Sequence, residues 1–243
     1  LHIIEGELPF PGEPVVPGHQ VIGTIDALGR GAKRFQIGER IGIAWLHHAC
    51  GTCRFCSAGQ ENLCENQRFT GYHRWGGYAE RAVVPEDFAY KIPEGLTDAE
   101  ATPLLCAGII GYRSLKRSLV QPGQSLALYG FGSSAHIVIQ IARHWGCDVY
   151  VCSRNESHAQ LALNLGARWA GSRAEEMPVR TDSAIIFAPA GNLVPVALER
   201  LIKGGTLALA GIYMSEIPPM DYERHLFYEK NLRSVTANTR QDG

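Results

Sequence analysis

Four cysteines within fifteen positions are the feature that most restricts the fold of this chain. Cys50, Cys53, Cys56 and Cys64 follow the spacing Cys-x2-Cys-x2-Cys-x7-Cys. Zinc binds four thiolates at about 2.3 Å in a closed tetrahedron, and a tight loop with short spacings supplies them. Free or disulfide-paired cysteines are the alternative, although disulfide frameworks usually spread an even number of cysteines through a small secreted domain. We therefore predict a structural zinc, with no coordination position left for a substrate.

The composition argues against nucleic acid and membranes as partners. The 243 residues carry 23 Lys+Arg against 24 Asp+Glu, and this balance provides no bulk basic field for nucleic acid or anionic lipid. A nucleic-acid-binding zinc ribbon is an alternative for the cysteine lobe alone, but only Arg54 and Arg68 accompany it. No apolar run reaches the roughly 20 residues that a bilayer requires. The chain has seven cysteines, an odd number, of which four are clustered; this pattern favours metal binding in a reducing compartment, so we expect a cytoplasmic protein.

The texture of the chain changes near Gly108, which predicts two domains, 1–107 and 108–243. The first is rich in Gly and Pro, and its clearest strands are expected at 21–25, 40–44 and 78–84. The second alternates apolar strands with helices, which predicts a parallel sheet covered on both faces. Its strands are expected at 125–129, 148–152, 183–187, 206–210 and 232–236, and its helices at 134–145, 156–165 and 194–203. The fold class is therefore α/β, with a β-rich domain first.

A glycine-rich turn follows the first strand of the second domain and opens a helix. Gly130 makes the tight turn, Gly132 allows the backbone to approach a pyrophosphate, and Ala135 allows close packing of helix and strand. Ser133 lies in this turn just before the predicted helix, whose free N–H groups and positive dipole end face the phosphates. A glycine-rich turn without a ligand is the alternative, but the complete strand–turn–helix context favours a dinucleotide site.

The end of the second strand of this domain indicates which dinucleotide is bound. An NAD site normally offers Asp or Glu there, whereas this chain has Ser153 followed by Arg154. Arg154 suits the 2′-phosphate of NADP through its planar guanidinium, and His158 adds a donor. We predict NADP over NAD; the alternative is that Arg154 is a solvated loop residue. Two further strands end at Phe187–Ala190 and at Gly211, which by position approach the nicotinamide.

These motifs together resemble the zinc-dependent alcohol dehydrogenases of the medium-chain dehydrogenase/reductase superfamily. The resemblance is carried by the cysteine lobe, the dinucleotide turn and three further segments: Gly18–Gly23, Gly76–Glu80 and Pro103–Gly108. It implies a GroES-like catalytic domain followed by a Rossmann domain. It also implies a catalytic zinc with two cysteine ligands, one histidine ligand and an open position, in which His19 and Cys106 match the histidine and the second cysteine. Taken alone, His19 is an ordinary turn histidine and Cys106 a core cysteine.

Parts of the family's catalytic apparatus are expected outside these 243 residues. The first cysteine ligand and a Ser or Thr hydroxyl fall before Leu1, and His2 matches the histidine that passes the alcohol proton to solvent. The last part of the catalytic domain is expected beyond Gly243, so we interpret the chain as a fragment lacking both ends. Gln20 stands where most of the family has Glu, which removes a negative charge near the metal.

The resemblance implies an oxidoreductase that transfers hydride between NADP(H) and an alcohol or aldehyde. Two zinc ions per full-length chain and a dimer or tetramer are expected with it. Trp45 matches an aromatic that walls the substrate pocket, where it would favour primary alcohols; a core tryptophan is the alternative. Other functions left open are an oxidoreductase of polyols or other carbonyls, and a protein that binds NADP and zinc without catalysis.

Overall fold

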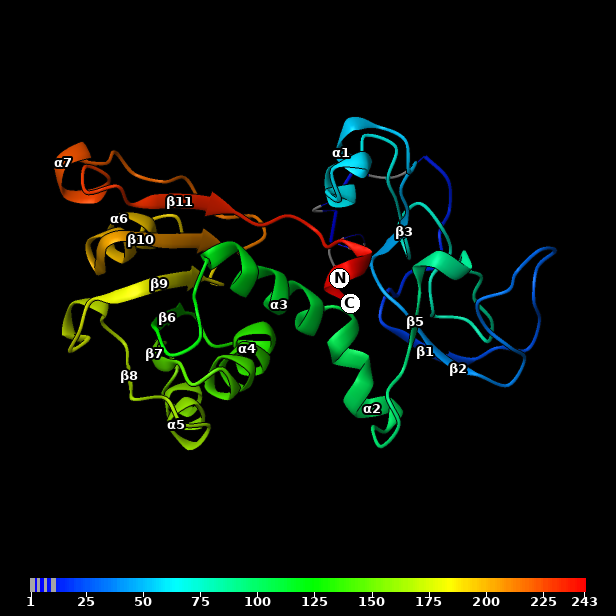
Figure 1. The fold of residues 1–243 in the computed structure, drawn as a ribbon, viewed down its shortest axis with the longest axis horizontal. Helices are drawn as coiled ribbons and strands as arrows, with labels where there is room; N and C mark the ends of the chain where they lie inside the picture. Colours follow the sequence, from blue (N-terminus) through cyan, green and yellow to red (C-terminus); the bar gives the residue numbers. More distant parts are fainter. Residues whose placement is uncertain (1–2, 4, 7, 10–11) are drawn as a thin grey trace. The chain divides into compact units, whose positions relative to one another are not determined.

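The structure is a computed structural model that describes residues 3, 5–6, 8–9 and 12–243, and it divides into two compact units (Figure 1). Unit 1 contains Leu1–Ile109 together with Thr236–Gly243, and unit 2 contains Ile110–Val235. The sequence-based division assigned Thr236–Gly243 to the second domain, whereas the structure places this segment with unit 1. A hydrogen bond of 3.0 Å from Asn62 Nδ2 to the Thr236 carbonyl is one of the contacts responsible.

Unit 1 is built from short strands and short helices. An antiparallel sheet has the order β1 (Val21–Thr24), β2 (Arg40–Ile43), β5 (Ala89–Lys91), and β3 (Leu46–His48) pairs with β4 (Arg68–Phe69). The helical elements are α1 (Arg54–Ser57), η1 (Glu61–Leu63), η2 (Glu86–Phe88), α2 (Asp98–Ala101), η3 (Thr102–Leu105) and η5 (Arg240–Asp242). A capping box between Thr97 and Glu100 begins α2. Small apolar clusters, rather than one large core, hold these pieces together.

The strand expected at 78–84 is not formed, because this segment pairs with no strand in the described part of the chain. Residues 78–84 form bends and irregular backbone. Tyr78 is 78% exposed and Val83 is 84% exposed, so their apolar side chains do not alternate into a core. The backbone just before this segment contacts the loop at Val16 instead, because the N–H of Gly76 donates to the Val16 carbonyl at 2.6 Å.

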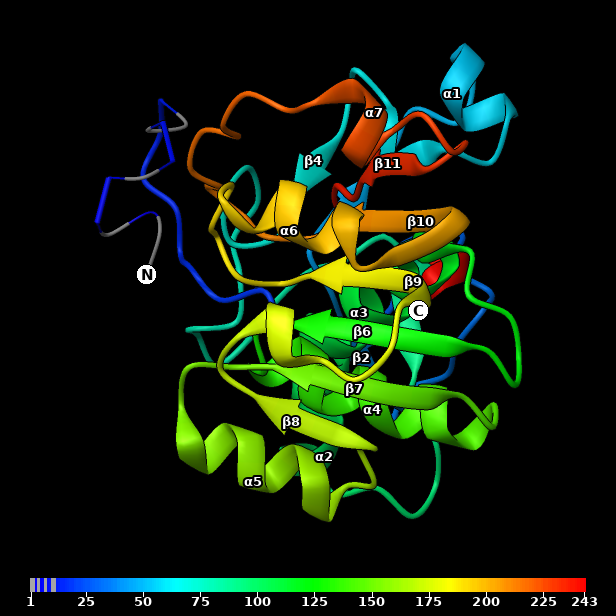
Figure 2. The same ribbon diagram turned by 90° about the vertical axis from the view of Figure 1, so that its left-hand side faces the viewer.

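Unit 2 contains a six-stranded parallel sheet. Its order is β11 (Asn231–Ser234), β10 (Leu201–Leu209), β9 (Thr181–Ile186), β6 (Ser125–Tyr129), β7 (Asp148–Cys152), β8 (Trp169–Gly171), and Figure 2 shows the strands side by side. The first strand of the unit, β6, lies at the centre, and the chain builds outward from it first to one side and then to the other. This is the doubly wound arrangement in which ligands bind at the carboxyl ends of the central strands.

Side chains that alternate along the strands pack into two separate hydrophobic cores, one on each face of the sheet. On one face, Leu126 and Leu128 pack with α3 (Ala107–Ser118), α4 (Ser133–His144) and α5 (Glu156–Asn164). On the other, Ala127 and Tyr129 pack with α6 (Leu193–Glu199) and with the segment around η4 (Ala174–Glu176). The period of two in the strand sequence therefore gives a sheet buried on both faces. Among the described residues, no helix has the length and hydropathy needed to cross a bilayer.

The helix expected at 194–203 ends earlier, at Glu199. Leu201 already pairs with Thr181 in the parallel sheet, so β10 begins five residues before the strand that the sequence predicted from Thr206. The register shifts between Leu201 and Thr206, where Gly204 adopts a φ of 74°. Glycine tolerates this left-handed conformation. The irregularity allows β10 to include residues 201–203, which were predicted to be the end of the helix. A short helix, α7 (Tyr222–His225), follows before β11.

Candidate active site

The four clustered cysteines converge in unit 1. Their four Sγ atoms all lie within 4.8 Å of one another, and the Sγ atoms of Cys50 and Cys56 are 3.9 Å apart. A tetrahedral zinc with bonds of about 2.3 Å places its sulfur ligands about 3.8 Å apart, so this spacing fits the ion. All seven cysteines, each within the described part of the chain, are free thiols.

The loop that carries the four cysteines turns sharply at two glycines, and its backbone N–H groups donate to the sulfur atoms. Gly51 and Gly59 adopt φ values of 74° and 70°, which lets the loop reverse on either side of α1. The N–H of Cys53 donates to Cys50 Sγ at 3.3 Å, and the N–H of Cys50 donates to Cys64 Sγ at the same distance. Such donors favour the ionised form of a thiol, which is the form that ligates a metal.

The ionisation of these thiols also points to a cation. The backbone N–H groups of Thr52 and Cys53 lower the pKa of Cys50 to about 6. Desolvation raises the pKa of Cys56 to about 12. Cys50 and Cys56 thus differ in how readily they ionise. Four thiolates are stable together only around a positive ion, which the donor set is suited to bind.

The second predicted ligand pair, His19 and Cys106, also meets in unit 1. The two residues are 87 positions apart in the sequence, and His19 Nε2 lies 3.2 Å from Cys106 Sγ. An imidazole nitrogen and a thiolate sulfur on one tetrahedral zinc are about 3.5 Å apart, given bonds of about 2.0 and 2.3 Å. The pair therefore has the spacing of two ligands of one metal. Gln20, the next residue, is exposed.

Close backbone packing fixes the loop that carries His19. The N–H of Gly77 donates to the Gly18 carbonyl at 2.9 Å, and the N–H of Tyr78 donates to the Pro17 carbonyl at 3.0 Å. A Cβ on Gly76 would overlap the Gly18 oxygen, and one on Gly77 would overlap the Val21 side chain. The Gly76-Gly77 pair thus lets two backbones lie against each other directly before His19.

Cys106 is positioned by the end of η3. Its neighbour Leu105 is buried against Gly42 of β2, where an added Cβ would come within 2.7 Å of Leu105 Cδ2. Residue 42 of β2 therefore has to be glycine for Leu105 of η3 to pack against the strand. Burial raises the pKa of the Cys106 thiol, so metal binding at this site has to displace its proton.

An aromatic group lies beside the His19–Cys106 pair. The Trp45 indole meets the His19 ring edge-on, with centroids 5.0 Å apart at 72°. Phe69 stacks on Trp45 at 4.6 Å and 11°, and Tyr72 lies at 6.1 Å and 23°. Trp45 is half-buried, so it is neither a fully enclosed core residue nor a free surface side chain. Sequence reasoning did not identify Phe69 and Tyr72, because nothing local in their sequence marks a ring partner.

The dinucleotide turn of unit 2 has the geometry that its glycines predict. Gly130 adopts a φ of 88°, its N–H donates to the Cys152 carbonyl at 2.8 Å, and an added Cβ would lie 3.0 Å from the Ala188 nitrogen. At Gly132, by contrast, an added Cβ meets nothing within 4 Å, which leaves the backbone open to a ligand. Ala135 is fully buried in the core beneath.

Helix α4, which begins at Ser133, is not capped by a side chain. Its first N–H groups are therefore not satisfied by a protein cap, and they lie next to the open Gly132 backbone. A helix N-terminus in this state binds anions through its N–H groups and its dipole. The turn and the helix start are consequently suited to bind phosphate groups.

The residues after β7 are those predicted to bind the ribose of the dinucleotide. Ser153 is buried, with its N–H bonded to the Gly171 carbonyl at 2.8 Å. Asn155 caps α5, because its Oδ1 accepts from the N–H groups of Ser157 at 2.9 Å and His158 at 3.2 Å. The cap was not anticipated, although Asn before a helix is a recognised signal. Arg154 is exposed and forms no ion pair with any described residue.

The segments that follow β9 and β10, which were predicted to approach the nicotinamide, lie close to each other. Gly211 follows β10, and an added Cβ there would lie 2.8 Å from the Ala188 carbonyl oxygen, in the segment after β9. The segment after Gly211 continues across the neighbouring loop, where Ser215 Oγ accepts from the Gly191 N–H at 2.9 Å. His2, the predicted proton-relay residue, lies outside the described residues.

Comparisons with known proteins agree with this arrangement. The family described as alcohol dehydrogenase GroES-like domain matches residues 1–94, and the family described as zinc-binding dehydrogenase matches residues 135–242. A probable alcohol dehydrogenase of Mycobacterium tuberculosis is 51% identical over 247 residues, which covers 100% of this chain and 71% of that protein.

Solved structures show the same fold with both nicotinamide cofactors. The CAD structure from Helicobacter pylori complexed with NADP(H) has a TM-score of 0.84 at 27% identity, covering 94% of this chain and 69% of that one. The acetophenone reductase of Geotrichum candidum in complex with NAD has a TM-score of 0.85 at 25% identity, covering 100% and 72%. The class is that of the zinc-binding, NAD(P)-dependent dehydrogenases.

Within that class, the chain belongs to the zinc-dependent alcohol dehydrogenases of the medium-chain dehydrogenase/reductase superfamily. The GroES-like and Rossmann parts expected from the sequence are confirmed. So is the assignment to the oxidoreductases that act on alcohols.

Proposed function

We propose that this protein is an NADP-preferring alcohol dehydrogenase that, in the direction of NADPH oxidation, reduces aldehydes. The single observation that carries the proposal is the 3.2 Å separation of His19 Nε2 and Cys106 Sγ beside the Trp45 ring. Two soft metal ligands next to a half-buried aromatic surface suit a site that binds a small apolar molecule by its oxygen.

The proposed catalytic zinc is held by His19, Cys106 and the upstream cysteine that the family resemblance implies. When bound, the ion supplies Lewis-acid polarisation of the substrate oxygen. The second ion is structural, and Cys50, Cys53, Cys56 and Cys64 hold it. The two sets differ in the number of protein ligands, because four thiolates close a tetrahedral coordination sphere whereas two cysteines and one histidine leave the fourth position for substrate.

The proposed dinucleotide site uses the turn from Gly130 to Ala135 for the pyrophosphate and the Ser153–His158 segment for the ribose. The absence of a carboxylate at Ser153 removes the group that would repel a 2′-phosphate. Arg154 is exposed beside this position and is not held by an acidic partner among the described residues, so its guanidinium is free to pair with that phosphate. His158 lies in the first turn of α5, the helix capped by Asn155, and adds a second donor.

Further parts of the proposal concern the proton, the substrate and the assembly. His2 would pass the alcohol proton to solvent. The aromatic stack of Trp45, Phe69 and Tyr72 would crowd branched carbons and favour primary alcohols and unbranched aldehydes. We further propose that the protein is a cytoplasmic dimer or tetramer, for which the light-scattering mass of the full-length protein is the test.

Metal analysis combined with turnover of the full-length protein tests the function. We expect two zinc ions per chain and a higher kcat/KM with NADPH than with NADH across a panel of aldehydes. A polyol or sugar that outperforms every aldehyde would assign the protein to another oxidoreductase activity. One zinc per chain without turnover would assign it a non-catalytic binding role. Faster turnover with NADH would overturn the cofactor assignment.

A further inference from the structure

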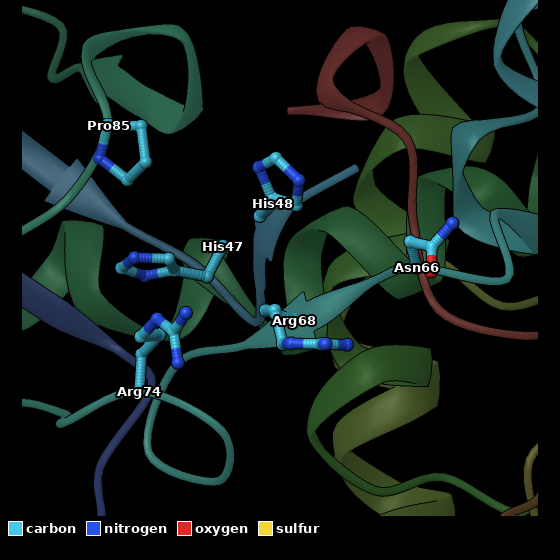
Figure 3. A pocket seen from close by; sticks show the side chains of 6 residues that line it. All are labelled: His47, His48, Asn66, Arg68, Arg74 and Pro85. Atoms are coloured by element: carbon cyan, nitrogen blue, oxygen red, sulfur yellow. The ribbon is translucent and has the colours of Figure 1, made fainter. Parts of the chain in front are cut away.

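A cavity in unit 1 is lined almost entirely by nitrogen-bearing side chains. It encloses about 340 Å³ and is formed by His47, His48, Asn66, Arg68, Arg74 and Pro85 (Figure 3). Its volume is at the lower end of the range of small-molecule sites, roughly 300–1,000 Å³. The catalytic and dinucleotide residues proposed above do not line it, so the proposed reaction does not account for it.

The positive charge in this cavity has no acidic counterpart. Neither Arg68 nor Arg74 forms an ion pair with a carboxylate in the described part of the chain. Each donates instead to the backbone carbonyl of the preceding residue, Arg68 Nη1 at 2.9 Å and Arg74 Nη1 at 3.0 Å. No Asp or Glu lines the cavity. The Glu86 carboxylate, next to Pro85 in the sequence, accepts the N–H groups of Lys33 and Arg34 at 2.8 and 2.7 Å.

A buried polar side chain forms the base of the cavity. His47 is only 6% exposed, and its Nδ1 lies 3.4 Å from the Thr70 hydroxyl oxygen. Burial, together with the charges of Arg74 and His48, lowers the pKa of His47 to about 4. At neutral pH its imidazole is therefore uncharged and has one N–H donor.

Both arginines act on the ionisation of a neighbouring histidine, which indicates a local positive field. After burial, the charges of Arg68 and Arg74 lower the pKa of His73, in the loop between them. Two cations that are not compensated by carboxylates and that act on the same histidine make the surface here attractive to an anion.

The arginines approach different parts of the cavity. In Figure 3 the Arg74 guanidinium lies close to the His47 ring, whereas the Arg68 side chain extends toward Asn66. The charge of Arg74, and not that of Arg68, contributes to the pKa of His47, in agreement with this placement. The cavity thus contains two groups of donors, one at Arg74 and His47 and the other at Arg68 and Asn66.

We propose that this cavity is a binding site for a small anion with two oxyanion groups, of the diphosphate class. One oxyanion group is bound by Arg74 and His47 and the other by Arg68 and Asn66. Guanidinium groups match the oxygens of phosphate with paired N–H donors, and the neutral amide and imidazole add directional bonds without further charge. The residues that line the cavity all belong to unit 1, whereas the dinucleotide turn belongs to unit 2.

Calorimetric titration with inorganic diphosphate tests the proposal on the zinc-loaded full-length protein. The protein is first saturated with its dinucleotide, so that the turn at Gly130–Ala135 and Arg154 are already occupied. We expect one diphosphate per chain, bound more tightly than monophosphate at the same ionic strength. Arg68→Gln and Arg74→Gln should each weaken diphosphate binding by about 10-fold or more. Zinc content and aldehyde turnover of the variants verify that they are folded.

Arg81→Gln is the matched control, because Arg81 is an exposed arginine of the same unit that pairs with Asp26 at 3.0 Å. Its diphosphate affinity should equal that of the wild type. The proposal is overturned if the wild type binds no diphosphate up to about 10 mM. It is also overturned if either Arg68→Gln or Arg74→Gln binds as the wild type does. Removal of zinc by diphosphate would affect all variants alike, and zinc analysis after the titration detects it.

Discussion

Arg240 and Glu61, which are 179 positions apart, form a two-pronged ion pair in unit 1. The guanidinium contacts Glu61 Oε2 through Nε at 2.9 Å and through Nη2 at 2.8 Å, and the Arg240 backbone N–H donates to Oε1. Glu61 begins η1, between the third and fourth clustered cysteines, and its side chain is 10% exposed. The Thr236–Gly243 segment is thus fixed to the cysteine lobe.

Removal of this pair should destabilise unit 1. Arg240→Ala leaves the nearly buried Glu61 carboxylate without its cation, and we expect a loss of about 1–3 kcal/mol in the free energy of unfolding, since Arg240 is itself 40% exposed. Denaturant unfolding of the zinc-loaded protein measures it. The double variant Glu61→Gln/Arg240→Ala should recover part of the loss. Equal stability of Arg240→Ala and wild type would contradict a structural role for the pair.

The cysteine lobe should lose its metal when one ligand is replaced. Cys64→Ser removes the most buried of the four thiols, and we expect zinc per chain to fall by one ion, with a lower melting temperature. Elemental analysis after gel filtration measures the zinc. Cys147→Ser is the control, because Cys147 is a buried thiol of unit 2 outside both ligand sets and should leave the zinc content unchanged.

The Gly76-Gly77 pair should be necessary for the His19 loop. A Cβ at residue 77 overlaps Val21, so Gly77→Ala should displace the backbone at Gly18 and reduce aldehyde turnover by about 10-fold or more, in line with the sensitivity of catalysis to small misplacements. Steady-state kinetics and zinc content are the measurements. Gly23→Ala is the matched control, since its Cβ meets nothing within 4 Å; equal losses in the two variants would refute the packing argument.

Arg154→Gln should change the choice of cofactor. Loss of a charge-assisted contact with the 2′-phosphate should raise the KM for NADPH by about 10- to 100-fold, while the KM for NADH stays within about 2-fold. Initial rates with each cofactor at fixed aldehyde measure this. Arg81→Gln, on unit 1, should alter neither value. An unchanged ratio of the two KM values in Arg154→Gln would show that the guanidinium does not bind the 2′-phosphate of NADPH.

The buried His47 should make the protein less stable in acid. Burial and two nearby cationic groups lower its pKa from 6.5 to about 4 in the folded state, so between these values the unfolded chain binds more protons. Stability is therefore complete above pH 6.5 and declines as the pH falls toward 4. His47→Gln should flatten this decline in urea titrations at pH 7.5 and 5.5 under excess zinc. The same replacement at exposed His144 should not, and parallel wild-type and His47→Gln curves would contradict the assignment.

The sequence predicted the regular part of the fold because short-range patterns determine it. The strands at 125–129 and 148–152 agree with β6 and β7, since apolar runs bounded by turn residues have few other solutions. It did not predict β8, whose three residues are too few for a periodic signal. The strand ascribed to 78–84 and the helix end at 203 were wrong, because pairing partners far along the chain decide both.

The same distinction between local and distant information applies to the site. Four cysteines at short spacing determine their own cluster, whereas the meeting of His19 and Cys106 depends on Gly42, Gly77 and the docking of η3. Only the family resemblance linked these two residues beforehand. Phe69, which stacks on Trp45, carries no local signal and was found only in the structure.

The bond between Glu61 and Arg240 also sets the order in which this protein can mature on the ribosome. Because the chain leaves unit 1 after Ile109 and returns at Thr236, unit 2 is synthesised between the two partners. At about 5–20 residues per second, roughly 10–35 s pass between the emergence of Glu61 and that of Arg240. During this interval the cysteine lobe of the nascent chain contains Glu61 but not yet Arg240. A zinc ion bound in this interval would therefore hold the lobe before the ion pair with Arg240 has formed.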